Sequence, residues 1–174
     1  MLSAFQMFQT LFQYDRQLIS QGEYWRLVTC HFTHVSWMHL LLNGLGLSFL
    51  VGLFAHLHSG VYWLLSACFG VVFTSVCLFV FVPQLQVYVG LSGLLYAFLV
   101  VGLVEKSAKG RFTYRLALVA VLIKVVVDTW VLLPGSTALI VGGRVVAEAH
   151  FYGVLSGLCI TFFGKLFDIL PSPY

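Results

Sequence analysis

A serine and a histidine, each near the start of an apolar segment, are the residues of this chain best suited to chemistry. Ser92 lies in the sequence Gly90-Leu91-Ser92-Gly93, and His150 lies near the start of the last apolar segment. A serine hydroxyl becomes an effective nucleophile when a positioned base takes its proton, and histidine can supply that base. The pair therefore indicates nucleophilic acyl transfer, with Ser92 as nucleophile and His150 as general base.

Two further polar residues, His39 and Asn43, are four positions apart and so share one face of an expected helix. Tetrahedral acyl chemistry needs hydrogen-bond donors for its oxyanion. We expect these two side chains to supply them, together with the free N–H groups at the start of the helix that contains Ser92. The glycines that flank the serine, Gly90 and Gly93, let the backbone approach closely.

Each of these residues also has an ordinary structural interpretation. A serine before a helix is a common N-cap, and a Gly-x-Ser-Gly segment in an apolar helix is often a packing face of small residues. His150 alone would also fit an interior histidine that is simply hydrogen-bonded. It is the convergence of four polar groups at one expected depth that favours catalysis.

The composition identifies the class of protein that must position these residues. Of the 174 residues, 60% are hydrophobic and 9% are charged, whereas a soluble domain carries about 25% charged residues. The mean hydropathy is +0.98, which excludes a soluble globular enzyme and a disordered chain. The net charge of +3 is too small for a surface that follows nucleic-acid phosphates. The chain is therefore expected to be a membrane protein with several spans.

Apolar runs outline the expected helices. They cover about 37–53, 61–82, 91–104, 112–133 and 147–166. The opening stretch, 1–13, is apolar but too short to cross a hydrocarbon core about 30 Å thick, so we expect a first helix that is truncated or partly interfacial. The sequence thus predicts one domain over 1–174, an all-α membrane protein with a bundle of six transmembrane helices of which the first is short.

Basic residues and helix length predict where the polar residues lie. The segment 105–115 holds Lys106, Lys109, Arg111 and Arg115 and is expected in the cytoplasm, which places 14–36, 83–90 and 134–146 outside. A helix from Ser92 to 104 is only about 20 Å long, so its outer end is expected roughly 10 Å below the outer surface. Backbone at that depth is tolerated beside a water-filled cavity. His39, Asn43, Ser92 and His150 would share that cavity.

These residues carry a family resemblance. The chain resembles the rhomboid intramembrane serine proteases over nearly its whole length, through four motifs in the family's order. They are Trp25-Arg26 with Thr29, the HxxxN motif from His39 to Asn43, Gly90-Leu91-Ser92-Gly93 with Tyr96, and Ala149-His150 with Gly153 and Gly157. Within the family the chain looks most like the rhombosortase branch. That resemblance rests on Tyr14-Asp15-Arg16, Gly22 to Leu27, Tyr88 to Gly93, and Gly142-Gly143 leading into Glu148-Ala149-His150.

The resemblance implies a six-helix fold and a Ser92–His150 dyad without a cofactor. It further implies oxyanion donors at His39, Asn43 and the Ser92 amide, and stacking of Tyr96 on His150. Gly153 and Gly157 would let the sixth helix pack close to the fourth. The implied substrates are exported proteins with a C-terminal Gly-Gly motif, one transmembrane helix and a basic end. The implied location is the bacterial inner membrane, with the site opening to the periplasm.

Several alternatives stay open. One is a catalytically silent rhomboid-like protein that binds client helices, and another is a small transporter that uses Lys124 and Asp128 in the fifth helix. For that pair we expect mutual neutralisation facing the bundle, with a proton relay or substrate recognition as the functional alternatives. The spacing of His31, His34 and His39 is unusual for zinc, so no metal is expected. Arg26 is expected to anchor the outer loop at the lipid headgroups.

Overall fold

The structure is a computed structural model that describes residues 4–131 and 145–166. In its described part, the regular secondary structure is helical apart from one short two-stranded ribbon. The elements in chain order are α1 Ala4–Phe12, β1 Tyr14–Asp15, α2 Arg16–Ser20, α3 Arg26–Thr29, η1 Cys30–Phe32, α4 Trp37–Phe54, η2 Ala55–Leu57, α5 Gly60–Phe81, β2 Val87–Tyr88, α6 Ser92–Ala108, α7 Phe112–Trp130 and α9 Ala147–Leu166. Gly142 and Gly143 lie outside the described residues.

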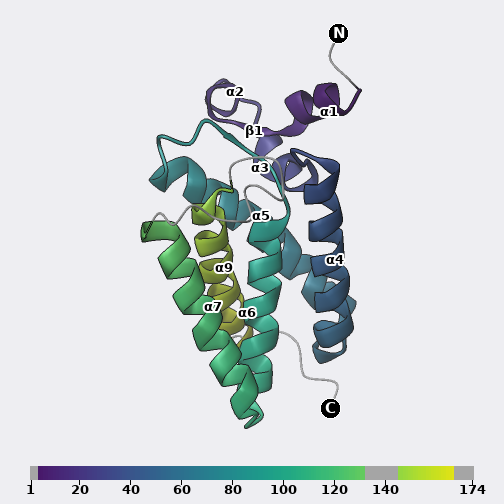
Figure 1. The fold of residues 1–174 in the computed structure, drawn as a ribbon, viewed down its shortest axis with the longest axis vertical. Coiled ribbons are helices and arrows are strands. Elements are labelled where there is room, and N and C mark those ends of the chain that lie inside the picture. The colour runs from purple at the N-terminus through teal and green to yellow at the C-terminus, as the bar shows by residue number, and fades with distance from the viewer. Residues whose placement is uncertain (1–3, 132–144, 167–174) are drawn as a thin grey trace.

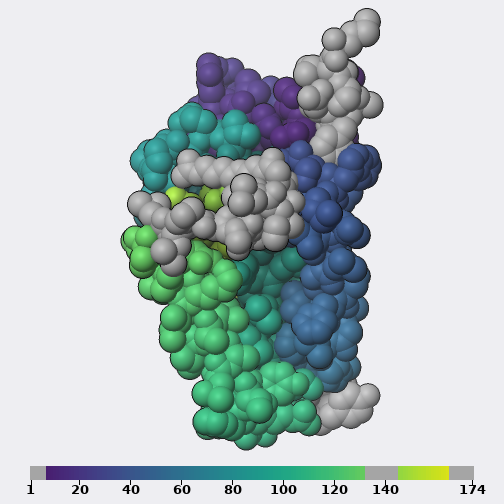
Figure 2. Space-filling model, in the orientation of Figure 1, coloured from purple at the N-terminus to yellow at the C-terminus, as the bar shows by residue number. Residues whose placement is uncertain are grey.

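The five long helices run side by side, with α6 in the middle (Figure 1). α6 contacts α4, α5, α7 and α9, and its contact with α9 is the most extensive. In the space-filling view, α4 and α7 form the two sides of one face, and part of α6 is visible between them (Figure 2). A helix surrounded by others in this way is suited to hold a reactive group inside the protein.

The outer faces of these helices are apolar. Leu45 on α4 is 58% exposed, Leu64 on α5 is 63% exposed and Ile123 on α7 is 59% exposed. Among the described residues, Trp37–Leu57 and Gly60–Phe81 are long and apolar enough to cross a membrane. Large apolar side chains on the outside of a folded chain are favourable where the surrounding solvent is lipid.

Local sequence signals set where helices begin. The Ser36 hydroxyl accepts a hydrogen bond from the His39 N–H, and the Ser59 hydroxyl accepts one from the Tyr62 N–H. These N-caps satisfy backbone donors that have no partner within the helix. The Ser36 cap starts α4 just ahead of His39. It therefore fixes the direction in which the His39 side chain points from the helix.

For the apolar run 91–104, the expected helix end at residue 104 is wrong. α6 continues to Ala108, so Glu105 and Lys106 are helical and not part of a loop. Both are good helix formers, and a charged residue ends the apolar run without ending the helix. The turn to α7 comes at Gly110, whose φ of +80° favours glycine. The start of α6 at Ser92 agrees with the expectation.

The segment after α1 is tied to the segment before α6. β1 and β2 pair antiparallel, with Tyr14 opposite Tyr88 and Asp15 opposite Val87. The next residue, Arg16, donates from its guanidinium group to the carbonyls of Leu78, Phe79, Val82 and Leu85, at 2.8 to 3.0 Å. These carbonyls lie at and just beyond the C-terminal end of α5. The ribbon and the arginine thus fix the segment that leads to Ser92.

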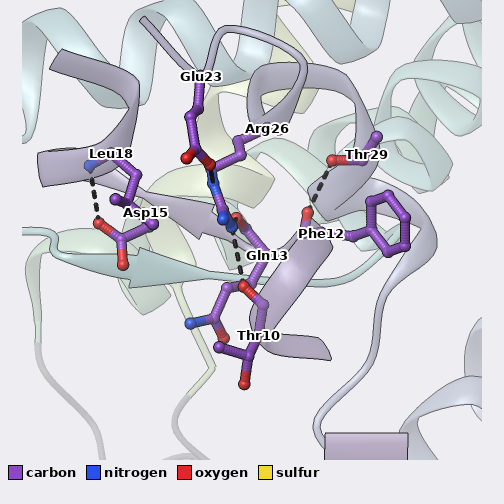
Figure 3. A network of polar contacts seen from close by, with 8 residues as sticks. All are labelled: Thr10, Phe12, Gln13, Asp15, Leu18, Glu23, Arg26 and Thr29. Atoms are coloured by element: carbon purple, nitrogen blue, oxygen red, sulfur yellow. Dashed lines mark hydrogen bonds and ion pairs between the residues drawn. The ribbon is translucent and has the colours of Figure 1, made fainter. Parts of the chain in front are cut away.

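Arg26 has an internal role, and the expectation that it anchors the loop at the headgroups is wrong. It is only 4% exposed. Its guanidinium group donates to the carbonyls of Thr10 and Gln13, both at 2.9 Å, and pairs with Glu23 at 2.6 Å (Figure 3). Free carbonyls at the end of α1 are strong acceptors for a buried guanidinium group. Arg26 therefore joins the outer loop to α1.

Candidate active site

Ser92 and His150 are in contact. Ser92 is the first residue of α6, and its hydroxyl oxygen lies 2.9 Å from Nε2 of His150 near the start of α9. Ser92 does not cap its own helix, because the N-cap position is Leu91, which makes no side-chain cap bond. The N-cap interpretation of this serine is therefore wrong. Both side chains are only partly buried.

The imidazole of His150 is held by a tyrosine ring. Tyr96, one turn after Ser92, lies with its ring centroid 4.6 Å from that of His150 at an interplanar angle of 34°. Nδ1 of His150 is buried and has no hydrogen-bond partner in the part of the chain that the structure describes. Ring packing, and not a described carboxylate, therefore orients the imidazole toward the serine.

His39 and Asn43 lie at the backbone segment that precedes Ser92. A Cβ added at Gly90 would be 2.7 Å from Cε1 of His39 and 3.7 Å from Nδ2 of Asn43. Nδ2 of Asn43 and Nδ1 of His39 are buried, and neither is hydrogen-bonded to any described residue. The structure thus brings an amide donor and an imidazole to the N-terminal end of α6, where the first backbone N–H groups have no partner in the helix.

Small residues bring α6 and α9 into backbone contact. A Cβ at Gly153 would be 2.1 Å from the carbonyl oxygen of Gly93, and one at Gly157 would be 2.6 Å from the carbonyl oxygen of Ala97. Any larger side chain at these two positions would force the helices apart. The approach places His150, one turn before Gly153, within hydrogen-bond distance of Ser92.

The charged pair on α7 forms, but it does not face the bundle as expected. Lys124 and Asp128 make an ion pair whose side chains are 56% and 34% exposed. α7 packs mainly against α6 and α9, and large apolar side chains on its other face, such as Ile123 and Val126, are exposed. The pair lies close enough to His150 for both charges to act on that imidazole. It therefore lies at the edge of the site.

His34 adjoins the site, although the sequence analysis considered it only as a candidate metal ligand. Its ring lies 5.0 Å from that of His39, edge to face. Burial and, to a lesser extent, the neighbouring His39 lower the pKa of His34 to about 4. A neutral ring is thereby placed beside His39. The signal in the sequence was its position just before the Ser36 cap, which directs it back toward α4.

Trp25, the remaining predicted site residue, lies on the outer loop. It is 52% exposed and immediately precedes the buried Arg26. Arg26 joins the loop to α1, whereas most of the other predicted residues gather around the start of α6.

The arrangement combines a serine nucleophile, a base in hydrogen-bond contact, and donors beside the same helix end. These are the parts required for acyl transfer through a tetrahedral intermediate. In comparisons with known proteins, the family model for the Rhomboid domain matches residues 21–166. A search of curated proteins found no significant match. The matched range includes α6, α9 and every residue of the site described above.

Proposed function

The chain belongs to the rhomboid family, and from that membership we propose that it is a serine protease that cleaves peptide bonds within the membrane. Rhomboid proteins are membrane proteins and generally serine intramembrane proteases. The observation that carries the proposal for this chain is the 2.9 Å contact between the Ser92 hydroxyl and Nε2 of His150. We further propose a bundle of six membrane-spanning helices, with a short first one.

In the proposed reaction the Ser92 oxygen attacks the carbonyl carbon of the substrate while Nε2 of His150 takes the hydroxyl proton. The oxyanion accepts hydrogen bonds from the Ser92 N–H, the Asn43 amide and His39. The C–N bond then breaks, and His150 returns the proton to the leaving amine. This leaves an acyl-enzyme, which water hydrolyses with His150 again accepting a proton.

The proposed substrates are those of the rhombosortase branch. They are exported proteins with a C-terminal Gly-Gly motif, a single transmembrane helix and a basic cytoplasmic end, in the bacterial inner membrane. Support comes from the segments that resemble this branch. Two of them, Tyr14-Asp15 and Tyr88, meet in the ribbon that leads to Ser92. The site is proposed to open to the periplasm, since the basic turn between α6 and α7 is at the far end of α6 from Ser92.

The test is co-expression with a membrane-anchored Gly-Gly tail substrate, followed by mass spectrometry of the released C-terminus. Wild type should release the protein, and Ser92→Ala and His150→Ala should not. Matched controls are Ser107→Ala, near the opposite end of α6 from Ser92, and His56→Ala in η2 after α4, and both should release normally. The mass of the new C-terminus identifies the bond and the acceptor.

The same experiment separates the alternatives. Equal release by wild type and both site variants would overturn the Ser92–His150 mechanism. Binding of the substrate without release by any variant would favour a client-binding protein. Cleavage of a general rhomboid substrate, but not of the Gly-Gly protein, would retain the protease and remove the rhombosortase assignment.

A further inference from the structure

The backbone of Gly90 decides how the chain enters α6. Its φ is +120°. Its N–H donates to the carbonyl of Cys30 at 3.0 Å, and its carbonyl accepts from the hydroxyl of Tyr88 at 2.7 Å. Both polar groups of this residue are therefore bonded. Because Gly90 is two residues before Ser92, these two bonds set where the Ser92 N–H points.

Both residues that hold Gly90, Cys30 and Tyr88, adjoin His31. His31 follows Cys30 directly, is 0% exposed, and lies with its ring edge-on to Tyr88 at a centroid distance of 5.6 Å. It thus adjoins both the residue that accepts from the Gly90 N–H and the residue that donates to the Gly90 carbonyl. The proposed mechanism does not use His31.

His31 is fixed to α5 by its Nε2 atom. This nitrogen lies 3.1 Å from the carbonyl oxygen of Val71 and 2.9 Å from the hydroxyl oxygen of Ser75. A carbonyl oxygen can only accept, so the ring proton must be on Nε2. Burial lowers the pKa of His31 to about 4, although the Val71 and Gly90 backbones favour its charged form. The ring is therefore neutral at pH 7, in one tautomer and one orientation.

We propose that His31 is a positioning residue, which holds Cys30 and Tyr88 against α5 so that the Gly90 peptide presents the Ser92 N–H to the oxyanion. This inference deepens the proposed protease function and rests on it. A residue that only filled space would need no donor, and phenylalanine would replace it. A positioning residue needs the Nε2 proton, and glutamine, whose amide nitrogen is a donor, would largely replace it.

The test compares His31→Phe with His31→Gln on a cleavable transmembrane substrate in detergent. His31→Phe should lower kcat by about 10- to 100-fold, because small misplacements of a reacting group cost this much. KM should stay within about twofold, since the substrate-binding surface is unchanged. His31→Gln should retain kcat within about threefold. The matched control is Ser66→Ala, because Ser66 is also a buried polar residue and lies on α5. This variant should have the same kcat as wild type.

A milder variant and a second measurement distinguish a local effect of His31 from misfolding of the His31→Phe variant. Ser75→Ala removes one partner of His31 and should lower kcat by about two- to fivefold, with no further loss when combined with His31→Phe. Amide hydrogen exchange should become faster in the peptide 88–93 of His31→Phe, but not of His31→Gln. Equal kcat losses in the Phe and Gln variants, or unchanged exchange in both, would overturn the proposal.

Labelling of wild-type Ser92 by a fluorophosphonate distinguishes this inference from the proposed function. Absence of both labelling and cleavage in wild type would remove the protease, and with it the catalytic purpose of His31. Hydrogen exchange would then still show whether His31 holds the segment. Labelling of wild type with equally fast labelling of His31→Phe would retain the protease and remove the inference.

Discussion

The imidazole of His39 lies directly against the backbone of Gly90, so close that a single added carbon on Gly90 would be 2.7 Å from Cε1 of the ring. The side chain of His39 on α4 thus lies directly against the backbone of the segment that precedes Ser92.

Gly90→Ala should abolish most activity. The new methyl group would displace His39, and φ of +120° is strained for any L-residue at a cost of about 1–2 kcal/mol. Gly110→Ala is the matched control, because Gly110 also has a positive φ but has nothing within 4 Å of an added Cβ. It should lower the melting temperature slightly and leave kcat unchanged. Equal activity of the two variants would contradict the prediction.

Gly153→Ala should destabilise the fold and separate Ser92 from His150. A Cβ there would meet the Gly93 carbonyl, and overpacking of this kind costs about 1–3 kcal/mol. Gly52→Ala on α4 is the control, since its Cβ would meet nothing within 4 Å and alanine favours helix. Thermal unfolding in detergent should give a lower Tm for the first variant only. A Tm equal to that of wild type would show that the helices adjust.

Lys124→Met and Asp128→Asn should each reduce activity more than the double variant does. Each single change leaves one unpaired charge beside His150, whereas the double change leaves none. Initial rates for the four proteins form a double-mutant cycle with positive coupling. Additive losses would contradict a paired role. Ion flux in liposomes that persists in Ser92→Ala would instead favour the transporter.

Stability should fall as the pH drops below about 6.5. His31 is neutral when folded because burial lowers its pKa to about 4, whereas its ordinary value is 6.5. Above pH 6.5 neither state is protonated, so this group adds no pH dependence. Between pH 6.5 and 4 only the unfolded state binds the proton, which lowers the free energy of unfolding by about 1.4 kcal/mol per pH unit. Below pH 4 the loss is complete.

Melting curves between pH 7.5 and 4.5 check this sign. The Tm of wild type should fall more steeply with acid than that of His31→Gln, which has no group that titrates there. The buried His34 contributes in the same direction, so some slope should remain in the variant. Identical slopes for the two proteins would contradict the assignment of a neutral, buried His31.

The long helices and the contact between Ser92 and His150 could be predicted from the sequence. Apolar runs mark helices, and both residues were expected at outer ends of their runs. The hydrogen-bond partners of Arg16 and Arg26 could not be predicted. Both arginines bind backbone carbonyls, which every residue has and which no sequence pattern distinguishes. The two-residue strands were likewise too short to predict. The exposure of Lys124 depends on which helices cover α7, and spacing along the chain does not encode this.

The ribbon between β1 and β2 has a consequence for biosynthesis. Its two strands are separated in the chain by α4 and α5, so the first strand is made well before its partner. Closing this long loop requires the long intervening helices α4 and α5 to be in place. The segment that sets Ser92 therefore takes its final form late, after much of the chain has entered the membrane. A nascent chain would remain inert toward neighbouring helices until its own assembly is nearly complete.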